Sequence, residues 1–139
     1  MTLFEIVKKL KEIALKMPNI NSVYDGDVYM LNSIPNIDYN VFFITQSQHT
    51  VNEDTTQFNL TLYFIDRVFN DYSNALSIQS TGIEVLSSII KKFEYDVDEV
   101  NVDYGISFNT FTHKFSDVCA GVYCNLTIEV NNNINICGE

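Results

Sequence analysis

The sequence predicts an α+β fold: a mostly antiparallel sheet of about four to six strands, with two main helices packed on one face. Two stretches repeat apolar residues every three or four positions, as amphipathic helices do, and several others alternate apolar with polar residues, as half-buried strands do. The chain has 139 residues, of which 46% are hydrophobic and 19% are charged, enough for one buried core. We therefore expect a single domain over residues 1–139, in which 131–139 form a polar C-terminal tail.

The first helix is predicted to begin after Thr2. Thr2 and Glu5 have the spacing of a capping box, in which the Thr hydroxyl accepts a backbone N–H and the Glu carboxylate reaches back to another. Apolar residues then recur at helical spacing as far as Pro18, which ends the helix. They are Leu3, Phe4, Ile6, Val7, Leu10, Ile13, Ala14 and Met17.

Strand patterns follow the first helix. In order they are a small hairpin of residues 22–24 and 28–30, a covered strand at 39–45, an exposed loop at 46–56 and a half-buried strand at 57–64. The hairpin is predicted from Asp25-Gly26-Asp27, since Gly tolerates the positive φ of a tight turn. The last strand is the firmest of these predictions, because apolar and polar residues alternate along its length.

A second helix is predicted from Ser73, as its N-cap, to Phe93, and further strands follow. A short exposed strand is expected within 97–102 and another at 106–115, where a slip of the alternation near Asn109 predicts a β-bulge. In the final strand, five alternate residues form an inner face. They are Val122, Cys124, Leu126, Ile128 and Val130.

The charge of the chain limits its partners. Eighteen acidic and eight basic residues give a net charge of −10, which repels phosphate backbones and anionic membranes and argues against direct binding of nucleic acid. No apolar run approaches the roughly 18 residues of a membrane span. The first residues lack the apolar block of a signal peptide, so we expect the protein to be made and to stay in the cytoplasm.

Residues with catalytic chemistry are few. Cys119 and His113 are the one nucleophile and base pair close in sequence, and a buried or turn cysteine is the simpler interpretation. The three cysteines, Cys119, Cys124 and Cys137, include no Cys-x-x-Cys pair, so neither zinc nor any other cofactor is predicted. The sequence thus predicts a protein that is not an enzyme. If Cys119 did act as a nucleophile, Cys119→Ala would abolish the activity.

Five carboxylates lie between residues 94 and 103. They are Glu94, Asp96, Asp98, Glu99 and Asp103. Such a cluster could hold calcium, but it lacks the glycine and the terminal Glu of an EF-hand loop. A solvated acidic face, or an acidic channel lining that repels polyanions, is the preferred interpretation, and cation binding stays open.

Aromatic residues exceed the needs of one small core, with ten Phe and eight Tyr. Tyr63, Ile65 and Tyr123 fall on the outward faces of their predicted strands. Helices on one side leave the other sheet face uncovered, and a monomer seldom exposes a broad apolar patch. These three residues are therefore the candidate subunit interface, with half-exposed tyrosines or a second helix layer as the alternative.

The order of elements, together with the terminal stretch from Phe111 to Val130 (FTHKFSDVCAGVYCNLTIEV), resembles tailed-bacteriophage tail-terminator and neck (head–tail connector) ring proteins, particularly those of crAss-like phages. The resemblance implies a structural ring of six or twelve copies around the DNA channel, through which DNA passes without specific binding. It further implies contacts with neighbouring neck, portal or tail proteins, a place in the virion, and assembly in the bacterial host cytoplasm. It transfers no catalytic residues. The alternative is an acidic binding or inhibitory module that captures a basic protein.

Overall fold

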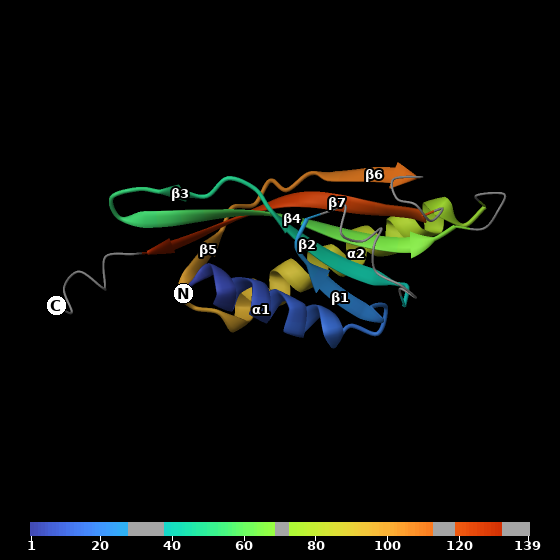
Figure 1. Ribbon diagram of the computed structural model, residues 1–139, viewed down its shortest axis with the longest axis horizontal. Coiled ribbons are helices and arrows are strands. Elements are labelled where there is room, and N and C mark those ends of the chain that lie inside the picture. Colours follow the sequence, from blue (N-terminus) through green and yellow to red (C-terminus); the bar gives the residue numbers. More distant parts are fainter. Residues whose placement is uncertain (28–37, 69–72, 113–118, 132–139) are drawn as a thin grey trace.

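The computed structural model describes residues 1–27, 38–68, 73–112 and 119–131, and it has the predicted α+β architecture (Figure 1). The elements in chain order are α1 (Leu3–Leu15), β1 (Ser22–Asp25), β2 (Val41–Gln46), β3 (Thr50–Val51), β4 (Thr55–Arg67), α2 (Ala75–Asp96), β5 (Val100–Val102), β6 (Phe108–Thr112) and β7 (Cys119–Asn131). The sheet has seven strands rather than the four to six expected from the sequence, because the short β3 and the separation of β5 from β6 add to the count.

The sheet is built around a long antiparallel pair. β4 and β7 have 13 residues each and pair along their full length, from Thr55 opposite Asn131 to Arg67 opposite Cys119. On one side β2 pairs with β4 and β1 with β2; on the other, β5 and β6 pair with different parts of β7. Only the β1–β2 pair is parallel among the described strands. Every other described strand except β1 therefore pairs directly with β4 or β7.

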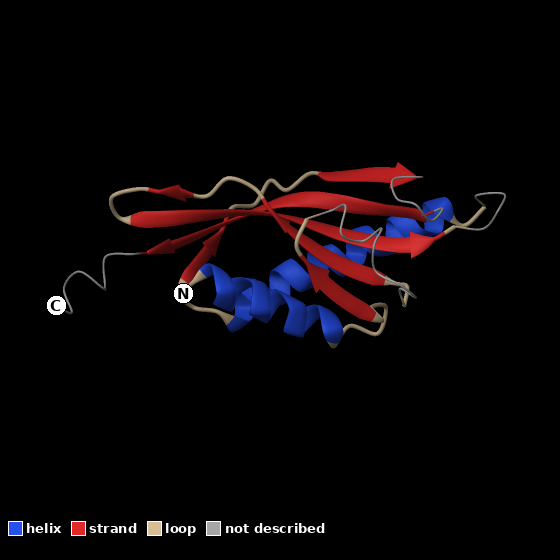
Figure 2. Cartoon of the chain, viewed as in Figure 1, coloured by secondary structure: helices blue, strands red, loops and turns tan. Residues whose placement is uncertain are grey.

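Both helices pack on the same face of the sheet (Figure 2). α2 packs on the even-numbered side chains of β4 and β7, which alternate into the core as the sequence predicted, and α1 packs on α2, β1 and β2. Gly82 of α2 marks the closest approach, since a Cβ there would lie 2.8 Å from Val122 and 2.9 Å from Phe64. All five predicted inner residues of β7 are buried. The predicted core face of the final strand is confirmed.

The start of α1 also matches its prediction. The Thr2 hydroxyl accepts the Glu5 backbone N–H at 3.2 Å, and the Glu5 carboxylate accepts the Thr2 backbone N–H at 3.0 Å. These hydrogen bonds lower the pKa of Glu5, because they favour its charged form.

Replacing Thr2 by Ala is expected to reduce the free energy of unfolding by about 1 kcal/mol, because the Glu5 backbone N–H loses the hydroxyl that accepts its hydrogen bond. Thr2→Ser keeps the hydroxyl and should stay close to the parent. Since the pKa of Glu5 is lowered on folding, the contribution of the box is present at neutral pH and is lost as pH falls and Glu5 is protonated. Urea unfolding at neutral and acidic pH checks both points; an equal loss at both pH values would contradict the role of Glu5.

The strand that follows α1 pairs differently from the predicted hairpin. β1 runs parallel to β2, and the Gly26 N–H continues that ladder by donating to the Ile44 carbonyl at 3.0 Å. Gly26 does adopt positive φ, at 139°. The second strand of the predicted hairpin, 28–30, lies outside the described residues.

The prediction of an exposed loop at 46–56 is wrong. β3 lies inside it and pairs with β4, and the Asn52 N–H donates to the Thr55 carbonyl at 2.7 Å in the tight turn between them. The segment shows no apolar alternation, but its β-branched residues on both sides of the turn favour extended backbone. Glu53 and Asp54 are exposed at the tip.

The second helix begins and ends slightly later than predicted. Its N-cap is Asn74, without a side-chain capping bond, rather than Ser73, and the helix continues past Phe93 to Asp96. The strand expected within 97–102 is β5, which starts only at Val100.

The bulge predicted near Asn109 is wrong in position. β6 pairs with β7 in unbroken register from Phe108 opposite Cys124 to Thr112 opposite Ala120. The irregularity lies earlier in the chain. Between the pairs Val102–Ile128 and Phe108–Cys124, the five residues 103–107 lie opposite only three residues of β7, 125–127. β5 and β6 are thus two parts of one interrupted edge, and residues 113–115 of the predicted strand lie outside the described residues.

None of the described helices is both long and apolar enough to cross a membrane.

Candidate functional site

The sheet face opposite the helices carries an aromatic cluster, and it contains the three predicted interface residues. Tyr63 and Tyr123 are directly paired across β4 and β7, with ring centroids 5.5 Å apart. Phe111 of β6 lies 6.3 Å from Tyr123 and 6.4 Å from Tyr63, also between centroids. The structure therefore brings Tyr63, Ile65 and Tyr123 into one cluster. Its other members include Val41, Phe43, Cys119, Tyr24, Tyr39 and Phe111.

Burial limits what this cluster can offer to a partner. Tyr63 is 7% exposed and Ile65 is 1% exposed, whereas Tyr123 and Phe111 are half-buried. Burial is the main cause that raises the pKa of Tyr63, followed by the Tyr123 hydroxyl. A neighbouring subunit would contact the rim of the cluster at Tyr123 and Phe111 rather than Ile65. That these residues form a subunit interface stays a prediction.

Beyond the aromatic cluster, the same face becomes polar. Three cross-strand pairs of β4 and β7 hydrogen-bond through their side chains: Thr61 to Asn125 at 2.9 Å, Thr127 to Asn59 at 2.7 Å and Gln57 to Glu129 at 3.4 Å. Each pair consists of residues directly opposite in the register. Because these groups satisfy one another, they keep the surface polar and ordered without presenting an obvious catalytic constellation.

The outer edge of the sheet at β6 is exposed and uncharged. The strand sequence is Phe-Asn-Thr-Phe-Thr, with Asn109, Thr110 and Thr112 exposed. Among the described residues, no strand pairs with the outer side of β6. The Gln79 side chain of α2 donates to the Phe111 carbonyl at 3.2 Å, which covers one end of this edge. The remaining edge lacks the Lys, Pro or bulge that usually prevents pairing with another chain.

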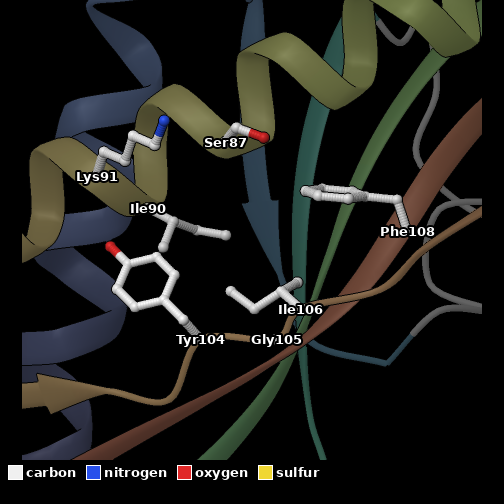
Figure 3. A pocket seen from close by; sticks show the side chains of 7 residues that line it. All are labelled: Ser87, Ile90, Lys91, Tyr104, Gly105, Ile106 and Phe108. Atoms are coloured by element: carbon white, nitrogen blue, oxygen red, sulfur yellow. The ribbon is translucent and has the colours of Figure 1, made fainter.

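A pocket of about 270 Å³ lies between α2 and the segment that leads into β6 (Figure 3). Its lining residues are Ser87, Ile90, Lys91, Tyr104, Gly105, Ile106 and Phe108. Lys91 and Tyr104 stand at one end and Phe108 at the other. The Tyr104 hydroxyl donates to the Glu94 carboxylate at 2.8 Å; slight burial, and then this acceptor, raise the pKa of Tyr104. The sequence did not reveal this pocket, because it needs the irregular segment 103–107 to approach the helix.

The cysteines do not form a nucleophilic site in the described residues. Cys119 is fully buried, and its thiol donates to the Tyr39 hydroxyl at 3.5 Å. Burial raises the pKa of Cys124 to about 12. His113, the predicted base, and Cys137 lie outside the described residues.

In a Cys137→Ser variant, the two remaining thiols are therefore expected not to react with an aromatic disulfide reagent at pH 8 in the native state. Both should react once urea unfolds the chain, because the thiolate is the reactive form and burial prevents its formation. Reaction of one thiol under native conditions would contradict the burial of these side chains.

The five carboxylates of 94–103 do not converge. Asp96 is paired with Lys9 at 3.7 Å and with Lys92 at 3.2 Å, while Glu99 lies 4.0 Å from the Met1 ammonium. Within the part of the chain that the structure describes, no group of three or more metal-ligating side chains occurs. The cluster is a dispersed surface with local ion pairs, and a calcium site built from it is not supported.

Three features of the described residues are therefore candidate contact surfaces: the rim of the aromatic cluster, the open β6 edge and the pocket beside it. In comparisons with known proteins, no protein-family model matches this sequence, and no curated protein matches it.

Proposed function

We propose that this chain is a non-enzymatic structural subunit of a tailed-bacteriophage virion, where copies form a ring at the neck or tail around the DNA channel. The observation that supports the proposal best is the open, uncharged edge at β6, in a chain whose net charge is −10. Copies of a strongly acidic chain repel one another over most of their surface, so association favours places that carry no charge.

Head-to-tail contact is the mode that this surface supports. The β6 edge and the far end of the sheet, where β3 and β4 form a hairpin, are unlike surfaces in different parts of the molecule (Figure 1). Contacts between unlike surfaces generate rings when the rotation closes.

Charge placement agrees with the same mode. Half of the basic residues lie on α1 or at its C-cap, namely Lys8, Lys9, Lys11 and Lys16. Lys9 and Lys11 are paired with Asp96 and Asp25, so Lys8 and Lys16 are the exposed cations of this end, whereas Glu53 and Asp54 form the exposed hairpin tip. Opposite charges on separate surfaces favour heterologous contacts over contacts of a surface with itself. An acidic ring would also let DNA pass without binding it.

Electron microscopy of the purified chain tests the proposal. We expect closed rings with a central channel, and we expect Thr110→Lys to reduce them strongly, because a charge on the edge strand opposes pairing. Asn19→Lys adds the same charge at an exposed position away from the edge and should leave the rings intact. Particles without rings, or a single chain that instead binds a basic protein, would contradict the proposal and favour the acidic binding module.

A further inference from the structure

We infer that the pocket between α2 and residues 104–108 holds the C-terminal tail, residues 132–139, of a second copy of the chain. The inference rests on the proposed association of copies and names the contact that joins one subunit to the next. The pocket, the tail sequence, the reach of the tail and the charge of Lys91 each support it.

The pocket suits apolar side chains of an extended segment. Its floor is formed by Ile90, Ile106 and Phe108, and its volume of about 270 Å³ is slightly below the roughly 300–1,000 Å³ of most small-molecule sites. Ile90 is 2% exposed, so it gives the pocket a firm base, whereas Ile106 and Phe108 are half-buried and accessible. A segment lying beside 104–108 would also meet the open edge at the start of β6.

The tail has the matching pattern. Its sequence, Asn-Asn-Ile-Asn-Ile-Cys-Gly-Glu, places Ile134 and Ile136 two residues apart, the spacing at which two side chains share one side of any extended segment. Glu139 follows three residues after Ile136. Two apolar anchors followed by a carboxylate correspond to an apolar floor with a cation at one end.

Lys91 is that cation. It is exposed at the end of the pocket beside Tyr104 and forms no ion pair with any described residue, unlike the adjacent Lys92, which pairs with Asp96. In a chain with eight basic and eighteen acidic residues, an exposed lysine beside an apolar pocket favours an acidic, apolar ligand.

The reach of the tail selects a second copy over the same chain. Phe108 lies opposite Cys124 and Val102 opposite Ile128, so Ile106 lies beside the 125–127 part of β7. Six residues of strand, about 20 Å, separate Asn125 from Asn131. Ile136 is five residues beyond Asn131, so it extends at most about 18 Å, and Ile134 at most about 11 Å. The pocket also lies one strand spacing to the side, about 5 Å. The two isoleucines therefore cannot both occupy the pocket of their own chain.

A labelled peptide tests this directly. The probe is a fluorescein-labelled peptide of residues 131–139 with Cys137→Ser, and the receptor is the full chain carrying Ile134→Asp and Ile136→Asp, whose own tails cannot compete. Fluorescence anisotropy should show saturable binding. Adding Ile106→Asp to the receptor should weaken binding at least tenfold, since it places a carboxylate on the apolar floor. Adding Asn19→Lys should leave binding unchanged.

A charge exchange provides a second variant in case Ile106→Asp disturbs folding. Lys91→Glu in the receptor should weaken binding by up to about fivefold. A peptide with Glu139→Lys should recover that loss on the Lys91→Glu receptor and bind the parent receptor less well.

The inference and the ring can fail separately. Absence of peptide binding, equal binding of a scrambled peptide, or no effect of either pocket variant overturns the inference, even if microscopy shows rings. Specific peptide binding by a chain that forms no rings supports the tail contact and overturns the proposed ring.

Discussion

Replacing Phe64 by Ala is expected to reduce the free energy of unfolding by about 3–5 kcal/mol, because it empties the centre of the core. Phe64 is 1% exposed, lies opposite both Phe42 and Val122 in the sheet, and contacts α2 at Gly82. Its removal leaves a cavity between the central strand and the helix, where close packing prevents full collapse. Urea unfolding followed by circular dichroism measures the change.

Phe4 provides the matched control. It is also a phenylalanine, on α1, but it is 74% exposed. Phe4→Ala should alter the free energy of unfolding by about 0.5 kcal/mol or less. Similar losses for the two variants would contradict the placement of Phe64 at the centre of the core.

The second large effect is expected from Gly121→Ala. A Cβ at Gly121 would lie 1.9 Å from the Phe64 carbonyl oxygen and 3.0 Å from the Phe111 ring, so the backbone of β4 or β7 must move. Overpacking of this kind costs about 3 kcal/mol, since backbone cannot give way as a flexible side chain can. The expected fall in melting temperature is about 6–12 °C for a chain of this size.

Asn109→Ala on the neighbouring strand is the control for this change. Asn109 is exposed on β6 and should tolerate the loss of its side chain with little effect. An unchanged melting temperature for Gly121→Ala would show that β4 and β7 do not approach as closely as described at this point.

The regular parts of the fold follow from local patterns. The strict alternation of β4 and β7 specifies which side chains enter the core, because a shift of one residue would turn every one of them to the other face. The capping box specifies the start of α1 through hydrogen bonds within four residues of sequence. Features of this kind require no knowledge of distant contacts.

The parts that could not be predicted depend on partners far away in the sequence. β1 lies beside β2 through a parallel pairing that no turn motif announces, and β3 is held by its register with β4. The pocket exists because 103–107 leave β7 and approach α2. The burial of Tyr63 and Ile65 likewise depends on tertiary packing, since their alternation alone placed them on an outward face.

The candidate interaction surfaces also depend partly on local sequence and partly on distant contacts. The surplus of aromatic residues and the uncovered sheet face pointed to association on that face, but not to the β6 edge or the pocket. The structure locates an uncharged edge at β6 and an apolar pocket beside Lys91, which has no ion pair within the described ranges. If these surfaces join acidic copies, screening of the repulsion elsewhere should strengthen assembly as salt rises toward about 0.15 M, where the Debye length is about 8 Å.

The mass of the native protein in solution, measured by light scattering over a range of concentrations at low and moderate salt, tests the central claim most directly. Our account predicts a closed assembly of six or twelve copies whose mass stops rising with concentration, because a ring has no free ends. The chain mass of 15.9 kDa makes these assemblies easy to distinguish from one chain. A mass of one chain at every concentration and salt would contradict the account.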